Sequence, residues 1–187
     1  PGSRLSEVSR HIKPLVDAAV ILRRERPVEF LVPILSGPSG EFVRRYLADH
    51  CPDGLPVHIV ENNTQRAIER ARIVITSSGT ATLETAILET PMIIIYKVSI
   101  PFEILGKLLV RVKDIGLVNI VAGRRICPEL TQRDASGAGI AREAMRLLAD
   151  PAAYDTMLAG IRAVKERLGA PGAIRRIARQ FVELIEE

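Results

Sequence analysis

The sequence contains no tryptophan, and aromatic residues make only 4% of its 187 residues. A hydrophobic core must therefore be aliphatic, which suits short Val/Ile strands packed under Ala/Leu helices. Hydrophobic residues make 47% and charged residues 26% of the chain. This composition excludes intrinsic disorder and supplies enough apolar side chains for one domain of ordinary size.

Cysteine and histidine are also scarce. Cys51 and Cys127 lie far apart and form no CxxC pair, which argues against a secreted disulfide scaffold and against a zinc site. We expect both thiols to be reduced and buried. The histidines, His11, His50 and His58, are scattered, and no pair of aspartates suits a divalent ion. The sequence therefore predicts a function without a metal or other cofactor.

No run of about 20 apolar residues occurs, so we expect neither a helix that spans a membrane nor a signal peptide before the first helix. The opening Pro1-Gly2-Ser3-Arg4 is typical of the turn after a strand, and we expect the chain to begin inside a larger protein.

A net charge of +4 indicates anionic partners: phosphate-bearing molecules or an anionic membrane surface. Scattered Lys and Arg without an aromatic platform argue against nucleic acid.

Helical segments and short apolar segments alternate along the chain. Apolar residues three and four apart predict a helix over 5–26, with Ser3 as its N-cap. We expect strands at 29–33, 56–60, 72–76, 92–96 and 118–121, and further helices at 41–49, 62–71 (capped by Asn62 or Asn63), 79–88, 102–110, 135–149, 152–168 and 171–186. This alternation of strands and helices predicts one α/β domain over 1–187 with a doubly wound, Rossmann-like parallel sheet. Residues 151–187 are expected to form the C-terminal helices of the domain.

The strongest candidate for a binding site is Ile75-Thr-Ser-Ser-Gly-Thr-Ala-Thr-Leu-Glu84, where a buried strand turns directly into a helix. Free amides at the helix start and the helix dipole favour phosphate, and Gly79 permits close approach to the backbone. Thr80 and Glu84 share one helix face, so the Glu84 carboxylate is suited to accept hydrogen bonds from ribose hydroxyls. On the residues alone, an ordinary helix start with a solvated Glu84 explains the pattern equally well.

A second candidate is Gly2-Ser3-Arg4 at the start of the first helix. A glycine turn followed by arginine forms a corner that suits an anion, because a guanidinium can donate two hydrogen bonds to one phosphate. Considered by itself, this motif is better explained as an ordinary turn with an exposed arginine.

Together the motifs resemble those of the lipid-A-disaccharide synthases. The matching segments are Pro1-Gly-Ser-Arg4, Glu7-Val8, Pro14, Ser78-Gly-Thr-Ala-Thr-Leu-Glu84, Pro91-Met92, Tyr96-Lys97, Asn119-Ile120, Ala122-Gly123, Pro128-Glu129-Leu130, Gln132 and the helix pair Leu168-Gly169…Gly172-Ala173. Val118, Cys127 and Thr131 stand where the family pattern has Pro, Val and Leu. The resemblance implies the C-terminal, UDP-binding domain of a GT-B type glycosyltransferase, with the N-terminal acceptor domain outside this sequence.

By resemblance, the protein is an inverting transferase that moves 2,3-diacylglucosamine from UDP to 2,3-diacylglucosamine 1-phosphate, giving the lipid A disaccharide precursor. Arg4 would stabilise charge on the departing UDP. The general base belongs to the absent domain, so this chain alone is expected to bind donor without turnover. The residues implied to contact the substrate, through the diphosphate, the ribose or the wall of the donor pocket, are Ser3, Arg4, Ser78, Gly79, Thr80, Glu84, Lys97, Asn119 and Gln132. For Lys97 a place at a strand end without a phosphate contact is the alternative.

The acylated substrates imply a cytoplasmic protein at the periphery of the inner membrane of a Gram-negative cell. Residues 99–117 mix apolar and basic side chains, which fits either a helix resting on the membrane or a partly buried helix with a basic rim. An apolar stripe on the last helix predicts a homodimer or a domain exchange where it is exposed. The stripe consists of Ile174, Ile177, Phe181, Leu184 and Ile185.

Two other functions fit the same fold. A different UDP-sugar enzyme, such as a UDP-N-acetylglucosamine epimerase, shares the Ser-Gly-Thr…Glu turn, whereas the segment 119–132 favours the synthase. The non-enzymatic alternative is a nucleotide-binding or partner-binding module that stands alone.

Overall fold

The computed structural model describes residues 1–98 and 114–169, together with 172, 178 and 181. The elements follow the order α1 (Leu5–Glu25), β1 (Phe30–Ile34), α2 (Pro38–His50), β2 (Val57–Glu61), α3 (Thr64–Arg70), β3 (Val74–Ser77), α4 (Thr80–Ile87), β4 (Met92–Tyr96), α6 (Leu117–Ala122), β5 (Glu129–Thr131), α7 (Gly137–Ala149) and α8 (Pro151–Leu168). The helix expected at 102–110 lies outside the described residues, as does most of the helix expected at 171–186, with its apolar stripe.

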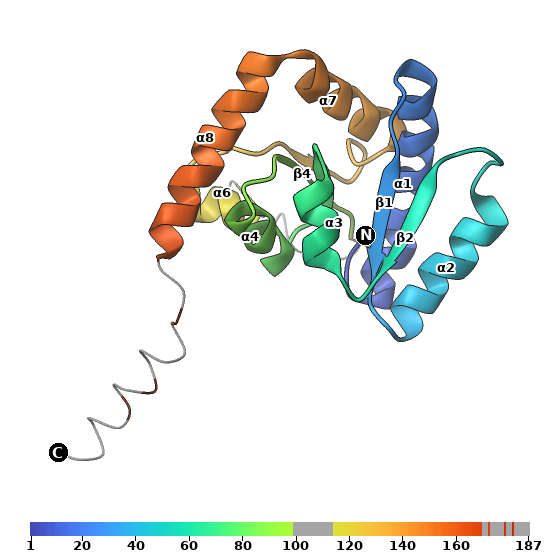
Figure 1. Cartoon of the computed structure of the whole chain (residues 1–187), viewed down its shortest axis with the longest axis horizontal. Coiled ribbons are helices and arrows are strands. Elements are labelled where there is room, and N and C mark those ends of the chain that lie inside the picture. The colour runs from blue at the N-terminus through green and yellow to red at the C-terminus, as the bar shows by residue number, and fades with distance from the viewer. Residues whose placement is uncertain (99–113, 170–171, 173–177, 179–180, 182–187) are drawn as a thin grey trace.

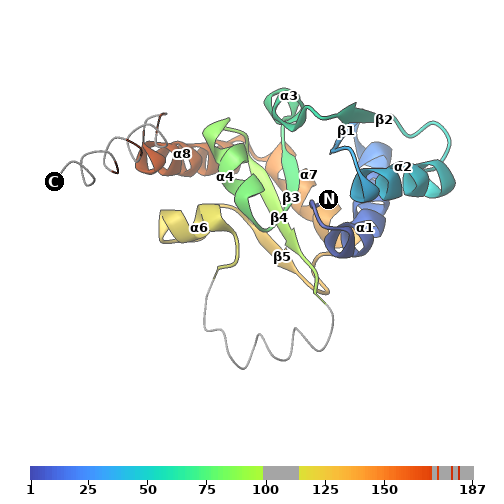
Figure 2. The same ribbon diagram turned by 90° about the horizontal axis from the view of Figure 1, so that it is seen from below.

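The strands are parallel, which confirms the predicted α/β fold. Their hydrogen bonds form two separate ladders: β1 pairs with β2, and β4 lies between β3 and β5. Figure 1 shows these two sheets side by side, and in Figures 1 and 2 alike the N-terminus lies between them. The carboxyl ends of the strands therefore form the edge at which ligand-binding turns are expected.

Strand β4 forms the centre of the core. Met92, Ile93, Ile94 and Ile95 have no exposed surface, as expected for a parallel strand covered on both faces. The helix α1 joins this core to a second one. Its C-terminal half contributes Ala18 and Leu22 to the core around β4, while its N-terminal half contributes to the core under β1 and α2. These N-terminal core residues are Val8, Ile12 and Val16.

The prediction of a last strand at 118–121 is wrong. Residues Leu117–Ala122 form the helix α6, and the last strand is β5 at Glu129–Thr131, paired with β4. The run Val-Asn-Ile-Val has strand propensity, but tertiary hydrogen bonds outweigh it. The Glu129 carboxylate accepts from the amides of Ile115 and Gly116 at the helix start, at 2.9 and 2.8 Å. Gly123 ends the helix with a φ of 71°.

The two expected helix caps have different outcomes. Asn63 caps α3, because its side chain accepts a hydrogen bond from the Arg66 amide at 3.1 Å. The expected cap at Ser3 is wrong: α1 begins after Arg4 with no capping side chain. The Ser3 carbonyl instead accepts a hydrogen bond from the Ser39 hydroxyl at 2.9 Å, which ties the start of α1 to the start of α2.

Both cysteines are free thiols. Cys127 is fully buried, and burial raises the pKa of its thiol to about 12, so it remains protonated and unreactive. Cys51 is only half-buried, in contrast to the expectation, because it follows directly after α2 at the surface. Among the described residues, no helix has the length and apolar character required to cross a membrane.

Candidate functional site

The two anion-binding corners predicted from the sequence lie beside each other. Gly2 has a φ of 126°, and a Cβ atom on it would lie 3.6 Å from the Ser77 hydroxyl oxygen and 3.0 Å from a Glu7 carboxylate oxygen. The start of α1 therefore lies against the turn between β3 and α4, although Gly2 and Ser77 are 75 positions apart in the sequence. Only a residue without a side chain fits this contact at this φ.

Arg4 stands at the N-cap of α1 with its side chain 81% exposed. Its guanidinium lies 3.6 Å from the Glu7 carboxylate, a solvent-screened pair that holds it weakly. Ser3 is exposed next to it. The guanidinium is thus able to reorient toward an anion at the adjacent turn.

The first turn of α4 offers free backbone donors. Its N-cap is Gly79, at φ 150° and ψ −162°, and no side chain caps the helix. A Cβ on Gly79 would have no neighbouring atom within 4 Å, so the space over this turn is open. Unpaired amides at a helix start carry partial positive charge and attract anions. The turn can therefore bind a phosphate through its backbone.

Thr80 and Glu84 are both exposed and stand one helical turn apart on α4. Thr82, Thr85 and Ala86 of this helix are buried, whereas Ile87 at its end is exposed. The two predicted ligand-contacting side chains thus lie on an exposed part of the helix, after the open turn at Gly79.

Ser78, Lys97 and Gln132 lie at the same edge of the sheet, but their polar atoms bond to the protein. The Ser78 hydroxyl donates to the Ile115 carbonyl at 2.6 Å. The Lys97 ammonium donates to the carbonyls of Gln132 at 2.9 Å and Ala135 at 3.4 Å. The Gln132 side chain bonds to the backbone of Val98. In this conformation the three side chains hold together the loops that follow β4 and β5.

Asn119 is fully buried in α6, and each of its polar atoms bonds to the protein. Its carbonyl oxygen accepts from the amides of Ile126 and Cys127, both at 2.9 Å. Its amide group donates to the Cys127 carbonyl and to the Glu129 carboxylate, both at 2.8 Å. The Asn119 side chain therefore presents no polar atom to a ligand in this conformation, and it fixes the loop that enters β5.

Two features of this edge were not found from the sequence. The first is His11, which is 1% exposed and connects the N-terminal corner to the end of β4. Its Nε2 accepts from the Lys97 amide at 3.2 Å, so Nδ1 must carry the proton that is donated to the Pro1 carbonyl at 2.8 Å. Burial, the largest cause, lowers the pKa of His11 and favours this neutral form. A lone histidine in a helical pattern gave no signal of this role.

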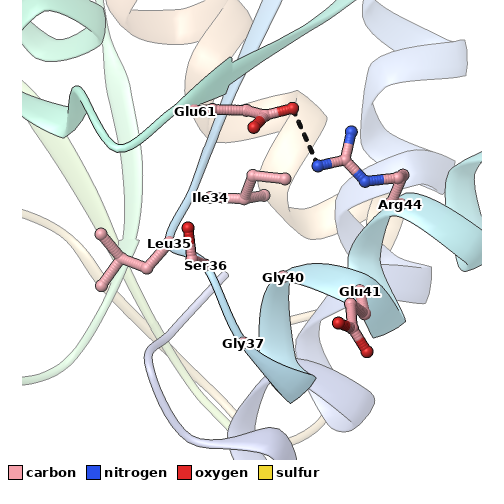
Figure 3. A pocket seen from close by; sticks show the side chains of 8 residues that line it. All are labelled: Ile34, Leu35, Ser36, Gly37, Gly40, Glu41, Arg44 and Glu61. Carbon is pink, nitrogen blue, oxygen red and sulfur yellow. Dashed lines mark hydrogen bonds and ion pairs between the residues drawn. The ribbon is translucent and has the colours of Figure 1, made fainter.

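The second feature is a small pocket of about 170 Å³ at the carboxyl ends of β1 and β2, shown in Figure 3. An ion pair between Arg44 and Glu61 crosses it, with the guanidinium nitrogen 2.8 Å from the carboxylate oxygen. The signal available in the sequence was the polar Ser36–Gly40 loop directly after a strand. The lining residues are Ile34, Leu35, Ser36, Gly37, Gly40, Glu41, Arg44 and Glu61.

No group of three or more His, Cys, Asp or Glu side chains suited to a metal occurs in the part of the chain that the structure describes. The described edge instead has backbone amides, one exposed guanidinium and exposed hydroxyl and carboxylate groups. Such a set can bind a phosphate and a sugar hydroxyl.

Comparisons with known proteins show the family to which the chain is similar. The family model described as lipid-A-disaccharide synthetase matches residues 1–175. The lipid-A-disaccharide synthase of Anaeromyxobacter dehalogenans (strain 2CP-C) is 39% identical over 183 residues, which cover 97% of this chain and 47% of that protein. The synthase of Geobacter sulfurreducens is 39% identical over 186 residues, covering 99% of this chain and 48% of the relative. The chain thus spans about half the length of the curated relatives it matches.

Among solved structures, the sucrose-phosphate synthase of Thermosynechococcus elongatus is similar, with a TM-score of 0.60. The similarity covers 96% of this chain and 44% of the other, at 18% sequence identity. This likeness shows a shared fold, that of a GT-B glycosyltransferase.

Proposed function

Because the chain belongs to the lipid-A-disaccharide synthetase family, we propose that it forms the donor-binding half of a glycosyltransferase. The complete enzyme would transfer 2,3-diacylglucosamine from UDP to 2,3-diacylglucosamine 1-phosphate, with inversion at the sugar carbon. The family match does not favour an epimerase or a nucleotide-binding module without catalysis. The general base for the acceptor hydroxyl would come from the part of the enzyme outside this chain.

The observation that carries the proposal is the meeting of the Gly2–Arg4 corner with the open turn at Gly79. The first amides of α4 would bind the diphosphate, and the Arg4 guanidinium would reach it from the side. Glu84, one turn further along the same face, would accept hydrogen bonds from the ribose. In this arrangement the phosphate would lie at the helix start and the sugar one helical turn further along.

These groups would also assist the reaction. When the bond from the sugar carbon to the diphosphate breaks, negative charge develops on the departing UDP. Backbone amides fixed at a helix start would stabilise that charge without first having to reorganise, as water must, and the Arg4 guanidinium would add its positive charge. We therefore propose metal-independent departure of UDP.

Binding of UDP to the full-length protein tests the proposal by calorimetric titration with and without EDTA. Glu84→Ala should weaken binding about tenfold, because a hydrogen bond to a charged group is lost. Arg4→Ala should weaken it by a similar factor, and EDTA should have no effect. Asp155→Ala on α8 and Arg142→Ala on α7 are matched controls, since both replace exposed helical residues. Equal affinity in Glu84→Ala and Asp155→Ala would refute the assigned ribose contact.

We also propose that the enzyme acts at the cytoplasmic face of the inner membrane, because both substrates would carry acyl chains. The segment that would contact the lipid surface, 99–117, lies mostly outside the described residues. Sedimentation of the protein with anionic vesicles at low and high salt tests this placement. Self-association through the last helix is a separate proposal, and sedimentation velocity over a range of concentrations tests it.

A further inference from the structure

Glu129 is a buried acidic residue that has no part in the proposed donor contacts. It stands at the first position of β5, beside the central strand β4. Its side chain is only 2% exposed. Removing a carboxylate from water is unfavourable unless its oxygens accept hydrogen bonds or lie near a positive charge. The partners of this side chain therefore indicate what it holds in place.

The Glu129 carboxylate directs both of its oxygens at the short segment that leads into α6. One oxygen lies 2.9 Å from the Ile115 amide nitrogen, and the other lies 2.8 Å from that of Gly116. The second oxygen also accepts from the Asn119 side chain at 2.8 Å. The Arg125 guanidinium provides a positive charge, with a nitrogen 3.9 Å from the first oxygen. Glu129 thus holds the backbone at the start of α6.

The peptide that joins Ile115 to Gly116 has a second anchor, in the turn between β3 and α4. Its N–H group donates to the Glu129 carboxylate, whereas its carbonyl accepts from the Ser78 hydroxyl at 2.6 Å. A trans peptide is planar, and its N–H and carbonyl groups point in opposite directions. The peptide therefore connects the carboxylate to the hydroxyl as one rigid unit.

This peptide packs without a gap against its surroundings. A Cβ atom on Gly116 would clash with the Ile94 side chain of β4 and would lie 3.1 Å from a Glu129 carboxylate oxygen. Because Gly116 has no side chain, its backbone lies directly against both residues. A displacement of the Glu129 carboxylate would thus move the peptide, since no free space absorbs it.

A second contact joins the starts of α6 and α4. The Val118 amide, in the first turn of α6, lies 3.4 Å from the Thr82 hydroxyl oxygen. This hydroxyl, which belongs to a residue without exposed surface, donates to the Gly79 carbonyl at 2.8 Å. Ser78 and Gly79 directly precede the free amides of α4, so contacts with the start of α6 hold both residues before these amides.

We propose that Glu129 is a positioning residue for the donor site. Through the peptide between Ile115 and Gly116 it holds Ser78, and with Ser78 the uncapped start of α4, in the conformation that lies beside Gly2. The inference rests on the proposed function, in which the first amides of α4 bind the diphosphate. It gives the inward-bonded Ser78 hydroxyl a role that needs no contact with the ligand.

Amide chemical shifts of the full-length protein without nucleotide test this connection. Glu129→Gln leaves one acceptor oxygen and places an NH₂ group against a backbone N–H, so the peptide has to move. The Gly79 and Thr80 amide signals should shift in this variant and in Ser78→Ala. In the double variant they should be those of Ser78→Ala alone. Unchanged signals in Glu129→Gln, or changes that add in the double variant, would overturn the proposal.

Calorimetric titration with UDP measures the consequence for binding, at a temperature where urea unfolding shows each variant to be folded. Glu129→Gln should weaken binding about tenfold. In the Ser78→Ala background its effect should be less than about twofold, because the connection is already broken. Glu143→Gln is the matched control: it removes a carboxylate from an ion pair with Arg146 on α7 and should leave the UDP affinity unchanged. An equal factor in both backgrounds would refute the positioning role.

The two measurements separate this inference from the proposed function. A parent protein that does not bind UDP would refute the donor site, whereas the amide shifts would still decide whether Glu129 sets the turn at Gly79. If the parent protein binds UDP and Glu129→Gln binds it equally well, the donor site stands and the positioning role is wrong.

Discussion

The turn from β3 into α4 and the segment from α6 to β5 both carry motif residues, yet they use their polar groups in opposite ways. Around Gly79 the backbone donors are uncapped, and Thr80 and Glu84 face solvent. Around Asn119 each polar side-chain atom bonds to the protein, and the Glu129 side chain is only 2% exposed. A shared motif can therefore mark a ligand contact or a fixed loop, and the hydrogen bonds distinguish the two.

Asn119→Ala should have the largest effect, and the effect should be on stability. The substitution removes the side-chain acceptor of the Ile126 and Cys127 amides, the donor to the Cys127 carbonyl and one of the hydrogen bonds to Glu129, which should lower the free energy of unfolding by about 3 kcal/mol. Urea unfolding measures this loss. The matched control Asn63→Ala removes one exposed cap bond and should cost about 1 kcal/mol.

If Asn119→Ala keeps the stability of the parent protein and loses UDP binding, the assignment of Asn119 to a fixed loop is wrong. That result would mean that the Asn119 side chain turns outward to meet the ligand. We expect UDP to bind the folded fraction of this variant with unchanged affinity.

Gly79→Ala should affect both stability and binding. A φ of 150° is unfavourable for alanine, and no neighbouring atom obstructs the new methyl group, so backbone strain alone should cost about 1–2 kcal/mol. The methyl group would also occupy the open space over the turn and weaken UDP binding at least about tenfold. Unfolding by urea and calorimetric titration measure the two effects.

Gly54→Ala is the matched control, because Gly54 also has a positive φ, of 79°, and open space at the Cβ position. It lies in the loop before β2, away from the proposed phosphate site. It should cost similar stability and leave UDP affinity unchanged. Equal loss of UDP affinity in both variants would show that strain, and not contact with the ligand, explains the Gly79 result.

The smallest expected effect is the pH dependence contributed by His11, which is buried and bonds to Pro1, next to the Gly2–Arg4 corner. Its pKa is lowered in the folded state, mainly by burial, from an ordinary value of 6.5. As the pH falls below 6.5, the unfolded state binds the proton first, so stability is complete above this pH and decreases below it. Unfolding by urea at a series of pH values below 7 should show this decline.

His11→Asn removes the titrating group and retains a donor for the Pro1 carbonyl, so it should flatten the decline. His50→Asn replaces an exposed histidine and is the control, which should keep the slope of the parent protein. A parent slope that persists in His11→Asn would assign the pH dependence to other groups.

The local chemistry of the sequence was sufficient for much of the fold. Apolar runs predicted four of the strands close to their observed positions, and the Ser-Ser-Gly-Thr turn predicted the helix start at Thr80. The prediction from the local sequence was wrong at 118–121, where β-branched residues indicated a strand. The helix there depends on a carboxylate from Glu129 and on the amide of Asn119, contacts that a local pattern does not contain.

The sequence by itself determined four of the strands and the positions of most of the described helices, because these follow from residue spacing and backbone preference. Only the tertiary structure decided that Gly2 lies against Ser77, that His11 is neutral and bridges two loops, and that Asn119 and Lys97 bond inward. The physical reason is that a polar side chain suits a ligand and a backbone group equally well. Which of them it meets depends on what the fold places within hydrogen-bonding distance.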